Sequence, residues 1–368
     1  MGVFDEVAAR EHEQVIFCHD PVSGLKAIIG IHNTTLGPAL GGCRMWSYEK
    51  EEDALKDVLR LSRGMTYKSA AAGLNLGGGK AVIIGNPKKD KSEALFRSYG
   101  RFVQGLAGRY ITAEDVGTTV RDMEWVRMES DFVTGISRAL GGSGDPSPVT
   151  ALGCYEGIKA SVKWQTGSES LEGKTVAVQG VGAVGYHLVQ HLTRDGAKVF
   201  ACDIDQENLK RVTRDFRGVE VVATDKIYDV ECDVFAPCAL GAVVNDETLP
   251  RLKCSIVAGS ANNVLAEEDK HSAALEKAGI LYAPDYVINA GGLINVANEL
   301  EGYNRERAIQ QAAGIYNIVT QIYQIARDEG VPTLKAANTL AERRIERIGR
   351  IKHSYAGVSV QKKGRGII

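Results

Sequence analysis

The sequence has few of the features that mark disulfide-rich, metal-binding or nucleic-acid-binding proteins. Its 368 residues include seven cysteines, an odd and widely spaced set without a CxxC pair, which argues against a disulfide framework or a cysteine-rich zinc site. Lys and Arg total 44 against 46 Asp and Glu, so no basic excess points to nucleic acid. Only nine prolines accompany 41 glycines, which indicates tight turns and close backbone approach rather than disorder. We expect no metal site.

Targeting and membrane signals are also scarce. Residues 1–13 are acidic and polar, unlike a signal peptide, and Glu6 stands where a myristoylation signal has Ser or Thr. The uncharged run from Thr175 to Thr193 has the length of a membrane span, but its Gln, His and Gly residues argue against one. We therefore expect a cytoplasmic protein.

A Gly-, Ser- and Pro-rich stretch, 141–148, separates two patterned regions and predicts domains at 1–148 and 149–330. The segment from 331 to 368 is expected to return to the first domain as a helix. Its part from Glu342 to Ile368 carries eight Lys or Arg against two Glu, typical of a solvated helix face and tail or of a subunit contact. In the first region we predict strands at 27–32 and 81–84 and helices at 51–62 and 91–106.

The second region alternates regularly between strand-like and helix-like runs. We predict helices at 150–165, 183–194 and 206–216, and strands at 175–179, 198–203, 219–223, 234–237, 255–258 and 280–283. This alternation predicts an α/β fold with a parallel, doubly wound sheet. The sequence from 304 to 350 has a strongly helical pattern.

A glycine loop follows the first of these strands. It has the GxGxxG pattern, in which glycines allow a tight turn and close approach of a pyrophosphate to a helix N-terminus. Asp203 ends the next strand, where a carboxylate accepts from the ribose hydroxyls and repels a 2′-phosphate, so NAD is favoured over NADP. The alternatives are a ligand-free turn with Asp203 as a helix cap, or Asp205 as the ribose acid. The loop comprises Gly180, Val181, Gly182, Ala183, Val184 and Gly185.

Two lysines, Lys68 and Lys80, lie among Ala, Gly and aliphatic residues. Burial and a neighbouring cation both lower a lysine pKa, so one of them can act as a general base while the other holds a carboxylate. The alternative is a pair of snorkelling lysines on a β-hairpin. A phosphate-loop reading fails, because Leu74 and Ala81 stand where that pattern needs Gly and Ser or Thr.

Asp115 follows the strand-like run 109–111, a usual place for a catalytic acid in an α/β domain. The alternative is an N-cap for a helix at 118–129. His187 and His191 have the spacing of a zinc-binding HExxH helix, but Leu188 replaces the glutamate, so we interpret both as structural.

Six segments occur in the order found in the glutamate/leucine/phenylalanine/valine dehydrogenases, which the whole chain resembles. They are 37–45, 65–84, 112–118, 145–151, the glycine loop and 289–296. The resemblance implies a substrate and assembly domain, a Rossmann-type NAD domain and an active site in the cleft between them. It also implies NAD-dependent oxidative deamination of an L-amino acid and a homo-oligomer, an octamer in the leucine-specific members, assembled through the first domain.

The resemblance also implies roles for individual residues. Lys68 would bind the substrate carboxylate with backbone groups of Gly41 and Gly42, Lys80 would activate water, and Asp115 would move protons at the amino nitrogen. The nicotinamide carboxamide would be oriented by Thr150 and Asn262, with Asn289 near the same ring.

The expected substrate pocket is aliphatic. Glutamate enzymes of the family resemble this chain but have Lys at the position of Leu40 and Ser at that of Val296. Without these groups a buried glutamate carboxylate would cost several kcal/mol. Phenylalanine enzymes tend to have Gly at the position of Ala113. With Met65 and Leu293 completing the pocket, we predict leucine as the best substrate, followed by isoleucine and valine. The alternatives are a valine- or phenylalanine-specific enzyme, or a non-catalytic NAD-binding scaffold.

Overall fold

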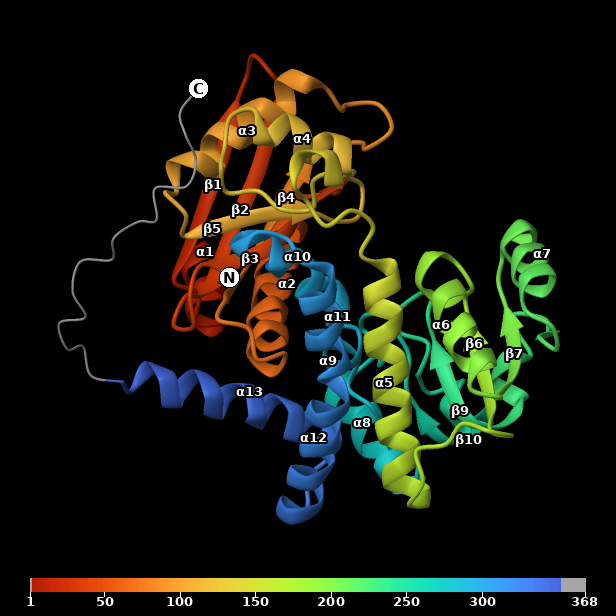
Figure 1. Ribbon diagram of the computed structural model, residues 1–368. Coiled ribbons are helices and arrows are strands. Elements are labelled where there is room, and N and C mark those ends of the chain that lie inside the picture. Colours follow the sequence, from red (N-terminus) through yellow and green to blue (C-terminus); the bar gives the residue numbers. More distant parts are fainter. Residues whose placement is uncertain (1, 352–368) are drawn as a thin grey trace.

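The computed structural model describes residues 2–351, which form two α/β parts joined by a layer of helices (Figure 1). Each part is built on its own sheet, of five and six strands respectively. None of the helices in this range is long and apolar enough to cross a membrane. The predicted two-part α/β architecture is confirmed.

The first sheet is mixed and has the order β1-β2-β4-β3-β5. Its inner strands β3 and β4 run parallel, as do β3 and β5, while β2 is antiparallel to both β1 and β4. The predicted strands at 27–32 and 81–84 fall within β2 and β4; β1 and β3 were not predicted. The strands are β1 (Gln14–Asp20), β2 (Leu25–Asn33), β3 (Ala39–Trp46), β4 (Gly77–Ile84) and β5 (Tyr110–Glu114).

The helices of this part are α1 (Val3–Ala9), α2 (Glu51–Ala71), α3 (Glu93–Gly105), α4 (Val120–Arg127) and the short η1 (Arg138–Leu140). Two of them begin at side-chain caps, because Ser92 accepts from the Leu95 N–H and Thr119 accepts from the Asp122 N–H. Since Thr119 caps α4, the alternative interpretation of Asp115 as that helix's N-cap is wrong.

Helix α2 is longer than predicted and continues past Ser62 to Ala71. Lys68 therefore lies on a helix and Lys80 on β4, so the β-hairpin alternative is wrong. Glycine allows the two elements to pack this closely, because a Cβ on Gly78 would stand 2.1 Å from the backbone nitrogen of Thr66. The glycine-rich segment thus brings both lysines to one place.

The second sheet is entirely parallel in its pairings and has the order β11-β10-β9-β6-β7-β8. This is the strand order of dinucleotide-binding domains. Successive strands are added on one side of β6 up to β8 and on its other side from β9 onward, and this switch leaves a crevice between β6 and β9. The predicted doubly wound sheet is confirmed. Its strands are β6 (Thr175–Gln179), β7 (Lys198–Cys202), β8 (Glu220–Val221), β9 (Glu231–Pro237), β10 (Lys253–Val257) and β11 (Leu281–Tyr282).

The helices around this sheet match the predicted ones closely, apart from α8 and two short turns. They are α5 (Ser147–Thr166), α6 (Ala183–Arg194), α7 (Gln206–Asp215), η2 (Ile227–Asp229), η3 (Leu249–Arg251) and α8 (Glu268–Lys277). The predicted boundaries of β6 and α6 agree with the structure to the residue.

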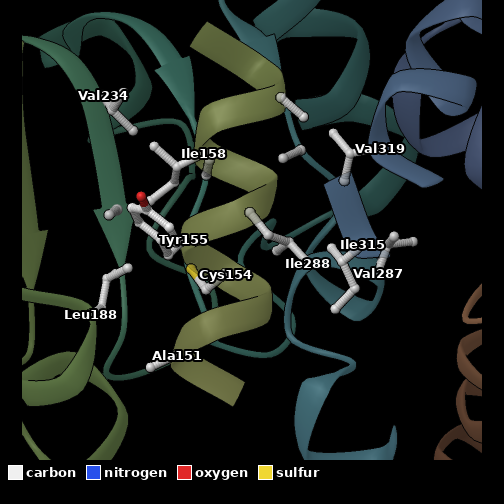
Figure 2. Packing of buried hydrophobic residues seen from close by; sticks show 14 of the residues in the cluster. Ala151, Cys154, Tyr155, Ile158, Leu188, Val234, Val287, Ile288, Ile315 and Val319 are labelled. Carbon is white, nitrogen blue, oxygen red and sulfur yellow. The ribbon is translucent and has the colours of Figure 1, made fainter. Parts of the chain in front are cut away.

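Helix α5 runs through the largest hydrophobic core. Figure 2 shows Cys154 and Ile158 of α5 between Leu188 of α6 on one side and Ile288 and Ile315 on the other. This core ties the second sheet to the C-terminal helices and fixes the start of α5 near the crevice. Those helices are α9 (Asp285–Ile288), α10 (Gly291–Ala297), η4 (Asn298–Glu301), α11 (Arg305–Ala313), α12 (Ile315–Glu329) and α13 (Thr333–Gly349).

Helix α13 packs against both α12 and α2, and Figure 1 shows it running from the second part back beneath α2. The Arg344 guanidinium donates to the carbonyls of Ala70, Gly73 and Leu74, which lie in and just after the last turn of α2. The last carbonyls of a helix and those just after it lack the usual N–H partners four residues on, so Arg344 caps the end of α2. Of the basic segment 342–368, residues 352–368 lie outside the described range.

Candidate active site

Lys80 and Asp115 meet at the carboxyl end of the first sheet. Lys80 is buried on β4, with 6% of its surface exposed, and Asp115 directly follows β5. Lys80 Nζ lies 3.0 Å from Asp115 Oδ2. Strand β3 pairs with both β4 and β5, which places the two side chains on the strands that flank β3. An ammonium and a carboxylate in direct contact form a pair that can exchange and store protons.

Arg44 is a third member of this group that sequence reasoning did not single out. Its Nε lies 3.1 Å from Asp115 Oδ2 and its Nη1 lies 2.9 Å from Asp57 Oδ2. Burial raises the pKa of Asp115, but the Lys80 ammonium and the Arg44 guanidinium outweigh burial and hold this pKa below its usual value. The sequence did offer a signal for Arg44, because it is a charged residue within the 37–45 segment. Most of that segment forms a mostly buried strand, β3.

Lys68 is the lysine with a markedly shifted pKa. Burial lowers the pKa of Lys68 to about 8, against the attraction of Asp285 and with a further lowering by Lys80. Asp285 is itself buried, which raises its pKa, and its oxygen accepts from the Val264 N–H. The expectation that one lysine pKa falls thus applies to Lys68, which the resemblance makes the carboxylate ligand rather than the base.

An apolar cluster lies beside these charges and draws on both parts of the chain. Leu40 of β3 and Leu293 of α10 are buried in it, and Met65 and Val296 pack against it. Ala113 is also buried, next to Gly42 in the β3–β5 register, but is not one of the cluster residues. The remaining members are Leu74, Leu76, Ile111, Phe132 and Ala297.

Gly41 and Gly42 are required by the packing of the sheet itself. A Cβ on Gly41 would lie 1.7 Å from the Gly79 carbonyl oxygen, and one on Gly42 would lie 2.8 Å from Asp115 Cβ. The Gly41 carbonyl accepts from the Tyr110 hydroxyl at 2.7 Å. These contacts hold β4 at Lys80 and the end of β5 before Asp115 tightly against β3.

The three glycines of the loop between β6 and α6 have distinct surroundings. Gly180 has φ +92°, and Gly185 packs so closely that its Cβ would lie 2.1 Å from the Gly180 carbonyl oxygen. A Cβ on Gly182 would meet no protein atom within 4 Å, and no side chain caps α6 at that residue. The loop therefore presents an open helix N-terminus, a geometry that suits a pyrophosphate.

Asp203 and Asp205 are separated by their contacts. Asp203 Oδ2 accepts from the Val181 N–H at 2.8 Å and so faces the glycine loop. Asp205 is the N-cap of α7 and accepts from the Glu207 N–H at 2.9 Å. The alternative that Asp203 caps the helix is therefore wrong.

Asn262 and Asn289 lie together, joined by a hydrogen bond of 2.7 Å between Asn289 Nδ2 and Asn262 Oδ1. Asn289 Oδ1 is buried without a partner among the described residues, so it is an available acceptor. Thr150 lies in the first turn of α5, where a Cβ on Gly292 would be 2.8 Å from its Oγ1. Together with the open helix N-terminus, these groups fit a nicotinamide dinucleotide.

Two other groups of residues carry side chains of the metal-ligand type. His191 stacks on Tyr155, with 5.0 Å between ring centroids, and burial lowers its pKa, in agreement with a structural role for this helix. Asp246, Glu267 and His271 also lie close together. The Lys270 ammonium contacts both of those carboxylates, at 2.6 and 3.1 Å, and so balances their charge.

Comparison with known proteins identifies the family. Residues 12–131 match the profile described as the Glu/Leu/Phe/Val dehydrogenase dimerisation domain, and residues 141–351 match the Glutamate/Leucine/Phenylalanine/Valine dehydrogenase profile. The chain is 61% identical over 355 residues to a leucine dehydrogenase from Thermoactinomyces intermedius, covering 96% of each chain. It is 50% identical to a phenylalanine dehydrogenase from Bacillus thermotolerans, covering 96% of this chain and 93% of the relative.

A solved structure agrees with these matches. The L-tryptophan dehydrogenase from Nostoc punctiforme superposes with a TM-score of 0.85 at 49% identity, covering 95% of this chain and all of that one. The chain therefore belongs to the glutamate/leucine/phenylalanine/valine dehydrogenase family of amino-acid dehydrogenases.

Proposed function

We propose that the protein catalyses the NAD-dependent oxidative deamination of L-leucine, with isoleucine and valine as further substrates, and the reverse reductive amination. The observation that carries this proposal is the convergence of Lys68, Lys80 and Asp115 beside an aliphatic cluster. The 61% identity to a leucine dehydrogenase supports the same assignment.

Substrate binding follows from the charges at the site. The Lys68 ammonium holds the α-carboxylate, while the backbone at Gly41 and Gly42 forms the adjoining wall. Leu40 and Val296 face the side chain from opposite parts of the chain. Thr150, Asn262 and Asn289 would orient the carboxamide of NAD, and the glycine loop and Asp203 would hold its pyrophosphate and ribose. Bound there, NAD would supply the acceptor for the hydride that leaves Cα.

The proton steps are assigned to Asp115 and Lys80. Asp115 is held as an anion by its two cationic neighbours, so it can take a proton from the substrate ammonium group. Lys80, in its neutral form, takes a proton from the water that attacks the substrate imine carbon. Asp115 then returns its proton to the nitrogen. As the C–N bond breaks and ammonia leaves, the hydroxyl group of the adduct gives its proton to the Asp115 carboxylate and becomes the carbonyl of the 2-oxo acid. Lys80 is buried and Asp115 is partly buried, which limits the access of bulk water to these transfers.

Relatives named for aromatic substrates are also about 50% identical to this chain, so overall identity alone does not fix the substrate. The assignment of the substrate therefore rests on the residues of the apolar cluster. A glutamate carboxylate placed beside Leu40 and Val296 would be desolvated without a partner, at a cost of several kcal/mol. An aliphatic pocket separates substrates that differ by one methylene by only about 1–3 kcal/mol. Isoleucine and valine should therefore react as well.

We also propose the division into a substrate and assembly domain (1–148) and an NAD domain (149–330), with α13 returning to the first. The supporting observations are the two sheets and the contact of α13 with α2. A homo-oligomer assembled through the first domain, as an octamer, and a cytoplasmic location complete the proposal. The description of residues 12–131 as a dimerisation domain supports the assembly.

The first test is a substrate panel. NADH formation is followed with NAD and leucine, isoleucine, valine, phenylalanine or glutamate at mildly alkaline pH. We expect the highest kcat/KM with leucine, lower but real activity with isoleucine and valine, and little with glutamate. A phenylalanine or glutamate optimum would overturn the pocket assignment. Folded protein that binds NAD but oxidises none of them would favour the scaffold alternative.

The acid of the dinucleotide site gives a second prediction. Asp203→Ala should raise the Kd for NAD by about 10–100-fold, because it removes charged hydrogen bonds to the ribose of about 1.5–3 kcal/mol. It should also narrow the preference for NAD over NADP, since the charge that repels a 2′-phosphate is gone. Isothermal calorimetry with both dinucleotides measures this without turnover.

Asp205→Ala is the matched control for this measurement. It removes the N-cap of α7, which costs about 1 kcal/mol of stability, but leaves the carboxylate that faces the glycine loop. We expect a lower melting temperature and an unchanged Kd for NAD. The reverse pattern, a Kd that responds to Asp205 and not to Asp203, would transfer the ribose role to Asp205.

A further inference from the structure

Arg44 connects the two proton-carrying residues to a second carboxylate. Its Nε shares Asp115 Oδ2 with Lys80, at 3.1 and 3.0 Å respectively. At its other edge Nη1 donates to Asp57 Oδ2 at 2.9 Å, and the Tyr48 hydroxyl donates to the same oxygen at 2.7 Å. Arg44 comes from β3, Asp57 from α2 and Asp115 from the end of β5, so one side chain ties three elements together.

We propose that Arg44 is a positioning residue, which keeps Asp115 aligned and balances the site's charge while Lys80 changes protonation. This inference rests on the proposed function. The charges on Lys80, Asp115, Arg44 and Asp57 sum to zero while Lys80 is protonated. When Lys80 becomes neutral to accept a proton from water, Asp115 still has one cation in direct contact. A buried carboxylate without that cation would be strongly destabilised.

The guanidinium is suited to this task because its planar fork presents donors along two edges. Nε donates to Asp115 and Nη1 donates to Asp57, so these two hydrogen bonds fix the orientation of the guanidinium from both sides. A lysine ammonium would keep the charge but would not hold both carboxylates in the same geometry. Arg44 therefore sets the position of Asp115 as well as the local charge.

Other titratable or charged groups also face the Lys80–Asp115–Arg44 group. Arg60 contacts the outer oxygen of Asp57 at 3.1 Å, and Asp285 faces Lys68. All of them except Tyr48, which the control variant replaces, remain in the variants below, so their effects cancel in comparison with the unmodified protein. The titratable or charged groups that face Lys80, Asp115, Arg44 or their partners from the elements packed around them are Cys43, Tyr48, Arg60, Lys68, Tyr110, Glu114 and Asp285.

The test uses two substitutions that change the local charge in opposite directions. In Arg44→Met a cation near Lys80 is lost, so Lys80 stays protonated to higher pH and the acid limb of the kcat profile for leucine oxidation moves up. In Asp57→Asn an anion is lost, so that limb moves down. Each shift should be about one pH unit. In Arg44→Met we also expect kcat to fall by about tenfold or more, with a smaller change in KM for leucine.

Tyr48→Phe is the matched control, because it removes one hydrogen bond to Asp57 and leaves both ion pairs of Arg44 intact. Its profile should stay in place. Shifts in the same direction for Arg44→Met and Asp57→Asn, or no shift in folded variants, would overturn the proposal. If Arg44→Met does not fold, the downward shift in Asp57→Asn decides alone.

A second measurement separates this inference from the proposed function. The pH dependence of Lys80 dimethylation by formaldehyde and cyanoborohydride, followed by peptide mass spectrometry, reports its protonation without turnover. The same opposite shifts are expected. If the protein without substitutions does not oxidise leucine, the proposed function is wrong. The methylation profiles would still decide whether Arg44 and Asp57 control the charge at Lys80.

Discussion

Replacing Lys80 with Met should reduce kcat for leucine oxidation by about 1,000-fold, because a positioned general base contributes about 10²–10⁴-fold. Methionine keeps the length and apolar stem of the side chain but has no proton to exchange. Asp115 keeps Arg44 at 3.1 Å, so the buried carboxylate does not become unpaired. The fold should therefore survive, and NAD binding should be unchanged. Stopped-flow measurement of NADH formation and a thermal melt check both expectations.

A second lysine on the same sheet provides the control. Lys26 lies on β2, which pairs with β4, but its side chain is 58% exposed and forms an ion pair with Glu51 at 3.6 Å. Lys26→Met removes the same charge from the same sheet and should leave kcat within twofold of the unmodified protein. If Lys80→Met turned over leucine at nearly the original rate, water would be activated by another group, and the base assignment would be wrong.

The sequence predicted the second part of the chain better than the first. Strands such as 175–179 and helices such as 183–194 alternate there with clear turns, and each element has the period of its own type. In the first part, α2 continues after Ser62 through a mixture of polar, small and large residues. Such a mixture gives little apolar periodicity, and the helix continues because glycines of β4 let it pack directly on the sheet.

The site shows the same limit. Its individual charges stand out in the sequence, since lysines and carboxylates among glycines and aliphatics are unusual. Their partnerships are not visible there, because Arg44 and Asp115 are brought together only by the pairing of β3 with β5. Asp285 lies far along the chain from Lys68, and its effect on that lysine follows from how the two parts pack. Which lysine has the lowered pKa is therefore a tertiary property.

The lowered pKa of Lys68 predicts that carboxylate binding weakens at alkaline pH. Burial lowers this pKa to about 8, so the ammonium form dominates below pH 8 and is lost above it. A carboxylate gains a charge-assisted contact only from the ammonium form. The affinity should therefore be constant below pH 8 and should fall about tenfold per pH unit above it. Substrate itself is a poor probe, because its own amino group titrates in the alkaline range.

The suitable probe is 4-methylpentanoate, which has the carbon skeleton of leucine without the amino group, and its binding is measured by calorimetry in the presence of NADH. Lys68→Met should weaken binding by about 100-fold or more, the cost of removing one partner of a buried charge pair. Lys68→Arg keeps a charge throughout, so its affinity should be independent of pH from 7 to 10, even if it is weaker. A pH dependence that persists in Lys68→Arg would belong to another group. A flat profile in the unmodified protein would mean that Lys68 does not titrate in this range or does not bind the carboxylate, and Lys68→Met distinguishes these, because only in the first case does affinity fall.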